Sequence, residues 1–288
     1  MKKILIFLAI IVFLVIAFVL FVNVNKNSHQ VVVLAYHNII PDDASKDLNE
    51  YDTLTVSQFE EQMKYLKDNN YETISASQLY EWKEGKTDIP KKSVLITFDD
   101  GYYSFKYVVQ PILEKYNFKA ICFLIGNSTP EKTLEYNPNT YGTVGMDEIK
   151  NHINNVEYGS HTFNLHYLTE NGEKSVRVLS KEELNKDTKE FDNTIFKAEY
   201  LAYPYYTYTK DFIEVLKENN YKLAFAGEEE MMSKGVNNYK IPRISGVKSI
   251  EEFKEIFETD KYKNKYGNGF IRKVCINLKR KIFKSLFL

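Results

Sequence analysis

Two histidines in a short polar stretch are the first residues of this chain whose spacing points to chemistry. His161 and His166 lie five positions apart in SHTFNLH, which follows VEYGS, a stretch typical of a short strand. A step of five turns away from a single helix face, so the pair fits a loop better than a helix. In α/β folds, loops at the carboxyl ends of strands carry the catalytic groups. Two unrelated loop histidines are the alternative.

Two adjacent acids follow an apolar run, in LITFDDGYYSF at residues 95–105. Neighbouring carboxylates repel each other unless a cation or a proton relieves them. One aspartate of the pair, Asp99 or Asp100, is then able to bind a divalent metal, while the other faces differently and acts as a base. The alternative is that both cap a helix that begins there, because Asp is favoured at helix starts.

Asp100, His161 and His166 together make a set of two imidazoles and one carboxylate. Such a set is common around a catalytic divalent metal that keeps open positions for water. The ion lowers the pKa of bound water from about 16 towards about 7 and polarises a carbonyl oxygen. The sequence therefore predicts one divalent metal ion, with Zn²⁺ expected first and Co²⁺ or Ni²⁺ as alternatives.

Strand and helix patterns alternate through the middle of the chain. We expect strands at 31–36, 71–75, 93–98, 119–126, 156–160, 200–204, 221–227 and 239–244. We expect helices at 55–70, 76–84, 102–117, 146–153, 180–195, 210–219 and 249–258. Thr55 and Gln58 form a capping-box pattern, and Pro111 is expected to kink or restart its helix. This alternation predicts a parallel, barrel-like α/β sheet in a single domain.

The two ends of the chain differ from the middle. Residues 4–22 are all apolar, close to the roughly 20 residues that cross a bilayer as a helix, and no small-residue cleavage pattern follows. We therefore expect an uncleaved signal anchor, with residues 1–3 in the cytoplasm and the chain outside the membrane after a linker at 23–30. The alternative is cleavage and secretion.

The tail at residues 259–288 is rich in Lys and Arg, with apolar residues at helical spacing. This pattern favours a basic amphipathic helix on anionic lipid. The alternative is a final helix that packs on the barrel and leaves its basic face solvated.

The composition limits the class of protein. The net charge is −1, so acidic and basic residues balance and nucleic-acid binding is not expected. The chain has two cysteines, one in an apolar run and one in the basic tail. Neither a disulfide framework nor a thiolate metal site is therefore expected.

TFDDGY and SHTFNLH are similar to the first two motifs of the polysaccharide deacetylase family, carbohydrate esterase family 4. The resemblance covers residues 31–258 and implies a distorted (β/α) barrel of about seven to eight parallel strands. It also implies that Asp99 is the general base and that Asp100, His161 and His166 hold the metal.

The five-residue histidine step is similar to one branch of that family, which deacetylates poly-β-1,6-N-acetylglucosamine. In that branch the general acid is a histidine just after the first strand. His37, in LAYHNII, occupies that place. The resemblance therefore implies that His37 is the general acid.

The third motif departs from the family pattern Arg-x-Pro-x-Gly. LAYPYYTY keeps Pro204 and Tyr205, but Ala202 stands at the Arg position and Tyr206 at the Gly position. The backbone N–H of Tyr205 is still implied as a donor to the oxyanion, since it needs no particular side chain. Arg243 is a candidate to orient the base in place of the missing Arg. An ordinary surface ion pair is the alternative for Arg243.

Tyrosines crowd the same stretch. Sugar rings present apolar C–H faces, so Tyr203, Tyr206 and Tyr208 are candidates for substrate binding. Plain packing of Tyr in a β-rich region is the alternative.

These observations predict a metal-dependent de-N-acetylase that acts on an N-acetylglucosamine-containing surface polysaccharide at the cell membrane. Poly-β-1,6-N-acetylglucosamine is the favoured substrate. Peptidoglycan N-acetylglucosamine or a glycan O-acetyl ester would use the same chemistry. The alternative from another class is a non-catalytic, membrane-anchored barrel that binds glycan, which the missing Arg and Gly of the third motif leave open.

Overall fold

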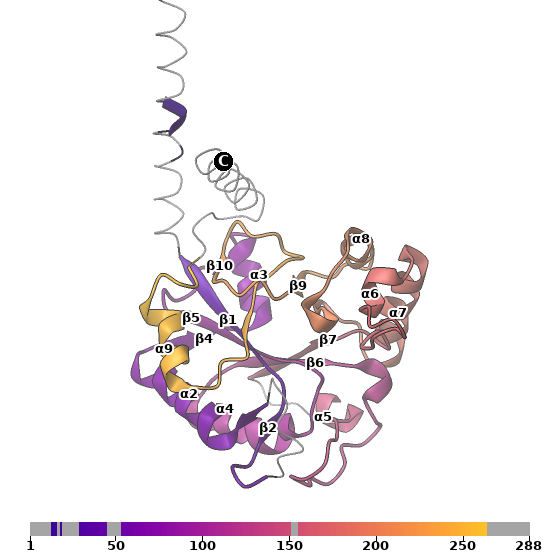
Figure 1. The fold of residues 1–288 in the computed structure, drawn as a ribbon, viewed down its shortest axis with the longest axis horizontal. Helices are drawn as coiled ribbons and strands as arrows, with labels where there is room; N and C mark the ends of the chain where they lie inside the picture. Colours follow the sequence, from indigo (N-terminus) through magenta and orange to yellow (C-terminus); the bar gives the residue numbers. More distant parts are fainter. Residues whose placement is uncertain (1–12, 16–17, 19–28, 45–52, 151–154, 264–288) are drawn as a thin grey trace, which may run out of the picture.

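A curled, mostly parallel β-sheet forms the centre of the fold (Figure 1). Within the described residues its strand order is β10-β1-β5-β6-β7-β8-β9, with β11 also on β1 and β4 also on β5. Its strands are β1 (Gln30–Tyr36), β4 (Glu72–Thr73), β5 (Ser93–Phe98), β6 (Ala120–Leu124), β7 (Val156–Ser160), β8 (Tyr200–Ala202), β9 (Leu223–Phe225), β10 (Met232–Ser233) and β11 (Ile244–Ser245). Only the short β10 runs antiparallel to its neighbour. A separate parallel pair joins β2 (Ile39–Ile40) and β3 (Leu54–Thr55).

The structure is a computed structural model that describes residues 13–15, 18, 29–44, 53–150 and 155–263. Most of the expected anchor segment, linker and basic tail lies outside these ranges. Among the described helices, none combines the length and the apolar character that crossing a membrane requires.

Helices pack against the sheet, most of them on its outer side. They are α2 (Val56–Asp68), α3 (Ala76–Lys83), α4 (Gln110–Tyr116), α5 (Met146–Lys150), α6 (Ser175–Val178), α7 (Lys181–Thr194), α8 (Lys210–Glu218) and α9 (Ile250–Glu258). In Figure 1, α2, α4 and α9 lie together on one side, and α6, α7 and α8 on the other.

The predicted signals at two helix starts are confirmed. Thr55 and Gln58 form the expected capping box at the start of α2. The helix expected at 102–117 is interrupted, since a π-helical turn at Phe105–Val109 precedes α4. Pro111 is the second residue of α4, in the first turn, where proline is tolerated.

Side chains alternate between two apolar clusters, as the period of two in a strand requires. Val32 and Leu34 of β1 pack with the helices on the outer side. Val31 and Val33 belong to the second cluster, which also contains Leu95 of β5. The same alternation places Thr97 and Asp99, both buried, on the face of Leu95. The acid therefore points into the sheet's concave interior.

The segment 241–245 links the two ends of the sheet. The N–H of Ile241 donates to Ala224 O (2.9 Å), which attaches the segment to β9. Three residues later β11 begins to pair with β1, so the segment crosses from β9 to β1. The strand expected at 239–244 is therefore wrong over most of its length. Pro242 lacks the N–H that a continuous ladder would need.

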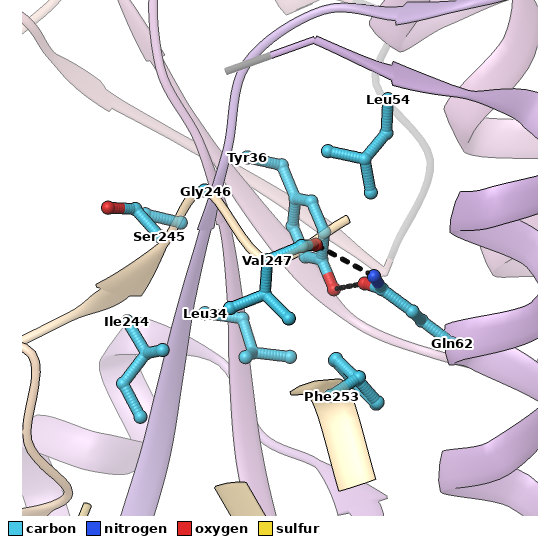
Figure 2. Close-up of a pocket in the computed structure, with 10 residues that line it drawn as sticks. Leu34, Tyr36, Leu54, Gln62, Ile244, Ser245, Gly246, Val247 and Phe253 are labelled. Carbon is cyan, nitrogen blue, oxygen red and sulfur yellow. Dashed lines mark hydrogen bonds between the residues drawn. The ribbon is translucent and has the colours of Figure 1, made fainter. Parts of the chain in front are cut away.

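A buried glutamine clamps the chain after this crossing (Figure 2). The hydroxyl of Tyr36 donates to Gln62 Oε1 (2.6 Å), and Gln62 Nε2 donates to Val247 O (2.9 Å). These bonds tie the end of β1, helix α2 and the segment after β11 together. They border a cavity of about 10 Å³, room for about one water.

We expect Gln62→Ala to lower the free energy of unfolding by about 1–3 kcal/mol, because the Tyr36 hydroxyl and the Val247 carbonyl lose their partner. Denaturant unfolding would measure the change. Glu61→Ala, at an exposed position of the same helix, is the control and should stay within about 0.5 kcal/mol. Equal effects of the two substitutions would contradict the clamp.

Candidate metal centre and active site

The carboxyl ends of neighbouring strands bring the predicted residues to one end of the sheet. His37 follows β1, Asp99 and Asp100 follow β5, and His161 follows β7. The strands are held in register up to these residues, since the N–H of Asp99 donates to Tyr36 O at 2.9 Å. Parallel sheets gather functional side chains at this end.

Asp100, His161 and His166 form a compact group of metal-binding type. Asp100 Oδ1 lies 3.4 Å from Nε2 of His161 and 3.4 Å from Nε2 of His166. One ligand atom from each residue lies within 4.8 Å of the others. Asp100 Oδ1 is buried and has no hydrogen-bond partner within the described part of the chain. An orphaned carboxylate oxygen facing two imidazole nitrogens suits a divalent cation.

The surroundings of His161 prepare it as a ligand. Its Nδ1 lies 2.9 Å from the carbonyl of Ala202, to which an Nδ1–H donates. That bond leaves the Nε2 lone pair facing Asp100, as in metal sites where the second ring nitrogen is held by a carbonyl. Burial lowers the pKa of His161 to about 4, so the ring is neutral at physiological pH. A neutral imidazole is the form that binds metal.

Asp187 of α7 shapes the loop between the two histidines. Its Oδ1 accepts from the N–H of Phe163 (2.9 Å), and its Oδ2 accepts from the N–H of Asn164 (2.7 Å). Burial raises the pKa of Asp187 to about 6, although both hydrogen bonds act in the opposite direction. This residue was not predicted from the sequence. Its signal is an acid on the buried face of α7, between Leu184 and Phe191.

Asp99 forms a buried, two-pronged ion pair with Arg243. The Nη1–Oδ1 and Nη2–Oδ2 distances are 2.7 and 2.8 Å, and the side chains are 0% (Arg243) and 2% (Asp99) exposed. Burial opposes the charged form of Asp99, but the charge of Arg243 outweighs it and holds the pKa of the carboxyl well below its usual range. Arg243 also donates to Ala226 O (3.1 Å) and Thr97 Oγ1 (3.2 Å). The pair is therefore not the ordinary surface pair that was the alternative.

His37 and Tyr206 border this ion pair. His37 Nε2 lies 3.9 Å from Asp99 Oδ2. The ring of Tyr206 meets the His37 ring edge-on at 6.4 Å, and its centre lies 5.1 Å from the guanidinium carbon of Arg243. The expected acid, base and orienting arginine thus lie in one place.

The third-motif turn keeps a left-handed shape without its glycine. Tyr205 and Tyr206 have φ of 52° and 57°. Gly227 makes room for Tyr206, since a Cβ there would lie 2.6 Å from the Tyr206 side chain. The turn also stacks the ring of Tyr205 on His166, with centroids 4.5 Å apart. Tyr206 therefore adopts the backbone conformation for which the family pattern has glycine.

Two of the three tyrosines expected to bind substrate contact other parts of the molecule. Tyr203 is fully buried and donates to Tyr239 O (3.2 Å), so its expected role in substrate binding is corrected. Its ring packs on Phe212 of α8, because the end of β8 lies beneath that helix. The hydroxyl of Tyr208 donates to Glu228 (3.0 Å). Of the three, Tyr206 is the one beside the predicted catalytic residues.

The parallel sheet and its His–His–Asp group, beside a buried acid and a histidine, define a metal-dependent hydrolase of barrel type. Residues 86–224 match the polysaccharide deacetylase family. Over 209 residues the chain is 32% identical to a poly-β-1,6-N-acetyl-D-glucosamine N-deacetylase of Staphylococcus aureus, covering 70% of each chain. The chain therefore belongs to the polysaccharide deacetylase family, whose members hydrolyse amide bonds.

Solved structures share the fold. A de-N-acetylase from Aggregatibacter actinomycetemcomitans is 26% identical, with a TM-score of 0.65 over 79% of this chain and 100% of that one. IcaB from Ammonifex degensii is 22% identical, with a TM-score of 0.65 over 79% of this chain and 95% of that one. At that identity the second likeness concerns the fold alone. The predicted deacetylase fold is confirmed as a curled, mostly parallel sheet.

We expect Asp187→Asn to weaken metal binding by about 10–100-fold, as loss of a supporting group around metal ligands typically does. The substituted amide has one acceptor oxygen for two N–H donors, so the loop that carries the histidines loses a bond. Competition with a chromophoric chelator would measure the affinity. Lys189→Ala, exposed on the same helix, is the control, and equal affinities in the two variants would contradict this role.

Proposed function

We propose that this chain removes acetyl groups from N-acetylglucosamine units of a surface polysaccharide, with poly-β-1,6-N-acetylglucosamine as the substrate. The observation that carries the proposal is the buried Asp99–Arg243 pair beside the group of Asp100, His161 and His166. The staphylococcal relative's substrate and the five-residue histidine step support this particular polymer.

The metal proposed for this group is Zn²⁺, with Co²⁺ or Ni²⁺ able to replace it. Two imidazoles and one carboxylate suit these ions and leave positions open. A bound ion supplies a Lewis acid that polarises the acetamide carbonyl and acidifies the attacking water.

Asp99 is the proposed general base. Arg243 holds both carboxylate oxygens, which fixes the direction of the group, and each oxygen keeps a second lone pair for a proton. The low pKa makes Asp99 a weak base. Lowering the pKa of the attacking water reduces the pKa difference that this proton transfer has to overcome.

His37 and the Tyr205 backbone complete the proposed reaction. Attack by water on the acetyl carbon moves charge onto the carbonyl oxygen, to which the Tyr205 N–H donates. The C–N bond then breaks with its electron pair going to nitrogen, and protonated His37 delivers a proton there. His37 Nε2 lies 3.9 Å from Asp99 Oδ2, so the proposed acid and base are close enough to act on the same acetamide group. The products are acetate and a free amine.

The proposed location is outside the cytoplasm. The apolar run at 4–22 would anchor the chain, with 1–3 in the cytoplasm, 23–30 as a linker and 31–258 as the catalytic domain. The basic tail at 259–288 would lie against anionic lipid. Cleavage after the apolar run would release the enzyme instead.

We expect Asp99→Asn to lower kcat for acetate release by about 10²–10⁴-fold while leaving metal affinity intact, because it removes the base and none of the metal ligands. Acetate assays and metal titration would measure the two effects. Full turnover by the folded, metal-loaded variant would contradict the assignment.

This substitution also leaves the charge of Arg243 buried without a partner, which destabilises a protein by about 3–5 kcal/mol. The double variant Asp99→Asn/Arg243→Gln removes both charges and is the matched control for folding. It should recover stability relative to Asp99→Asn and remain inactive.

A further inference from the structure

Most of the exposed large apolar side chains of the described residues lie in segments that follow three strands near the metal group. Apart from Phe13–Val15 and Phe18 near the N-terminus, those exposed within the described residues are Tyr107, Leu134, Tyr141, Tyr167, Leu168 and Val178. All lie in the segments that follow β5, β6 and β7. These are the strands whose carboxyl ends carry or adjoin Asp100 and His161. Exposed apolar patches on a soluble surface mark binding sites.

One part of this surface adjoins Asp100. Tyr102 follows Asp100 by two residues, so their Cα atoms are at most about 7.6 Å apart. The ring of Tyr141, 45% exposed, lies 5.8 Å from the ring of Tyr102. Backbone bonds fix the contact, since the N–H of Val144 donates to Gly101 O (2.9 Å) and Tyr102 pairs with Thr143. The long loop at 127–145 is thereby attached beside the metal group.

The other part adjoins His166. Tyr167, 42% exposed, is the next residue along the chain, and Leu168 is 52% exposed. A bridge between Leu168 and Lys174 folds this stretch back on itself. Lys174 Nζ donates to Tyr205 O (2.9 Å), which ties the stretch to the turn that carries the proposed oxyanion donor.

We propose that these side chains, Tyr102 and Tyr141 on one side and Tyr167 and Leu168 on the other, form subsites for the sugar units that flank the reacting unit. We call them the apolar rim. The inference rests on the proposed function. Asp100 Oδ1 and His166 Nε2 are 3.4 Å apart, so both halves of the rim adjoin members of one compact group. A polymer with its reacting unit at that group extends in both directions and contacts both halves.

The polar residues between the rings favour sugar over lipid as the occupant. Asn137, Asn139 and Thr140 are exposed beside Tyr141, and Asn164 is exposed beside His166. Uncharged amides and hydroxyls supply hydrogen bonds to sugar hydroxyls. The aromatic rings supply flat apolar faces for C–H groups. Insertion into a bilayer would take these exposed polar groups out of water, which is costly.

The test compares the full chain with Tyr141→Ala and Tyr167→Ala on N-acetylglucosamine dimers and pentamers with β-1,6 links. Each substitution should lower kcat/KM on the pentamer by about two- to tenfold, the effect of losing one ring contact, and should lower it less on the dimer, which needs only one flanking subsite. Tyr141→Phe and Tyr167→Phe keep the ring and should keep the activity. Mass spectrometry of the pentamer products should show that the two Ala variants shift the position of the free amine, which a loss of stability would not do.

Equal losses on dimer and pentamer, with an unchanged product pattern, would overturn the proposal while leaving the proposed function intact. Calorimetric titration of the pentamer into each protein provides a readout that needs no turnover. If the wild type releases no acetate, the proposed function fails. Weaker pentamer binding by the Ala variants would then still support the rim, and equal binding would overturn it. Loss of binding to anionic lipid vesicles in the Ala variants, with unchanged pentamer binding, would make the rim a lipid surface and overturn the proposal.

Discussion

The buried ion pair between Asp99 and Arg243 is the interaction on which the site and the closing of the sheet both depend. Taking two charges out of water is costly, and the cost is offset only when the geometry is good and the remaining donors are satisfied. Arg243 meets that condition with two bonds to Asp99 and two further bonds to Ala226 O and Thr97 Oγ1. Because Arg243 lies on the segment that crosses from β9 to β1, the same contact links the closing segment to the end of β5.

This arrangement accounts for the altered third motif. Ala202 has no charged side chain to offer, but its carbonyl orients His161. Arg243 supplies the guanidinium from the segment that crosses from β9 to β1. Its guanidinium carbon lies 5.1 Å from the centre of the Tyr206 ring. The small Gly227 leaves the space that this ring occupies. The positive charge beside the base is thus kept, although Arg243, which carries it, lies 41 positions after Ala202 in the chain.

Local signals in the sequence predicted much of the fold. Apolar runs and capping residues located β1, β5, β7 and α2, since each depends on its own side chains. The conformation of the segment 241–245 was not predictable, because it depends on contacts with β9 and β1, which lie elsewhere in the sequence. Asp100, His161 and His166 could be selected from residue type and spacing. These three residues come together because of the strand order, which no short motif records. The support from Asp187 depends on its burial on α7, which no short motif records either.

The tyrosines show the same limit. Residue type alone placed Tyr203 among the sugar-binding candidates, but it lies in the core beneath α8. Tyr141 and Tyr167 carry no motif, and it is exposure beside the metal group that distinguishes them.

The most direct test of the central claim is acetate release from β-1,6-linked and β-1,4-linked N-acetylglucosamine oligomers, with added Zn²⁺ or Co²⁺ and with chelator. A metal-dependent polysaccharide deacetylase of the proposed specificity would release acetate from the β-1,6 series, stop in chelator and recover when metal is returned. Release that continues in chelator, or no release from the β-1,6 series by protein shown to hold its metal, would contradict the account.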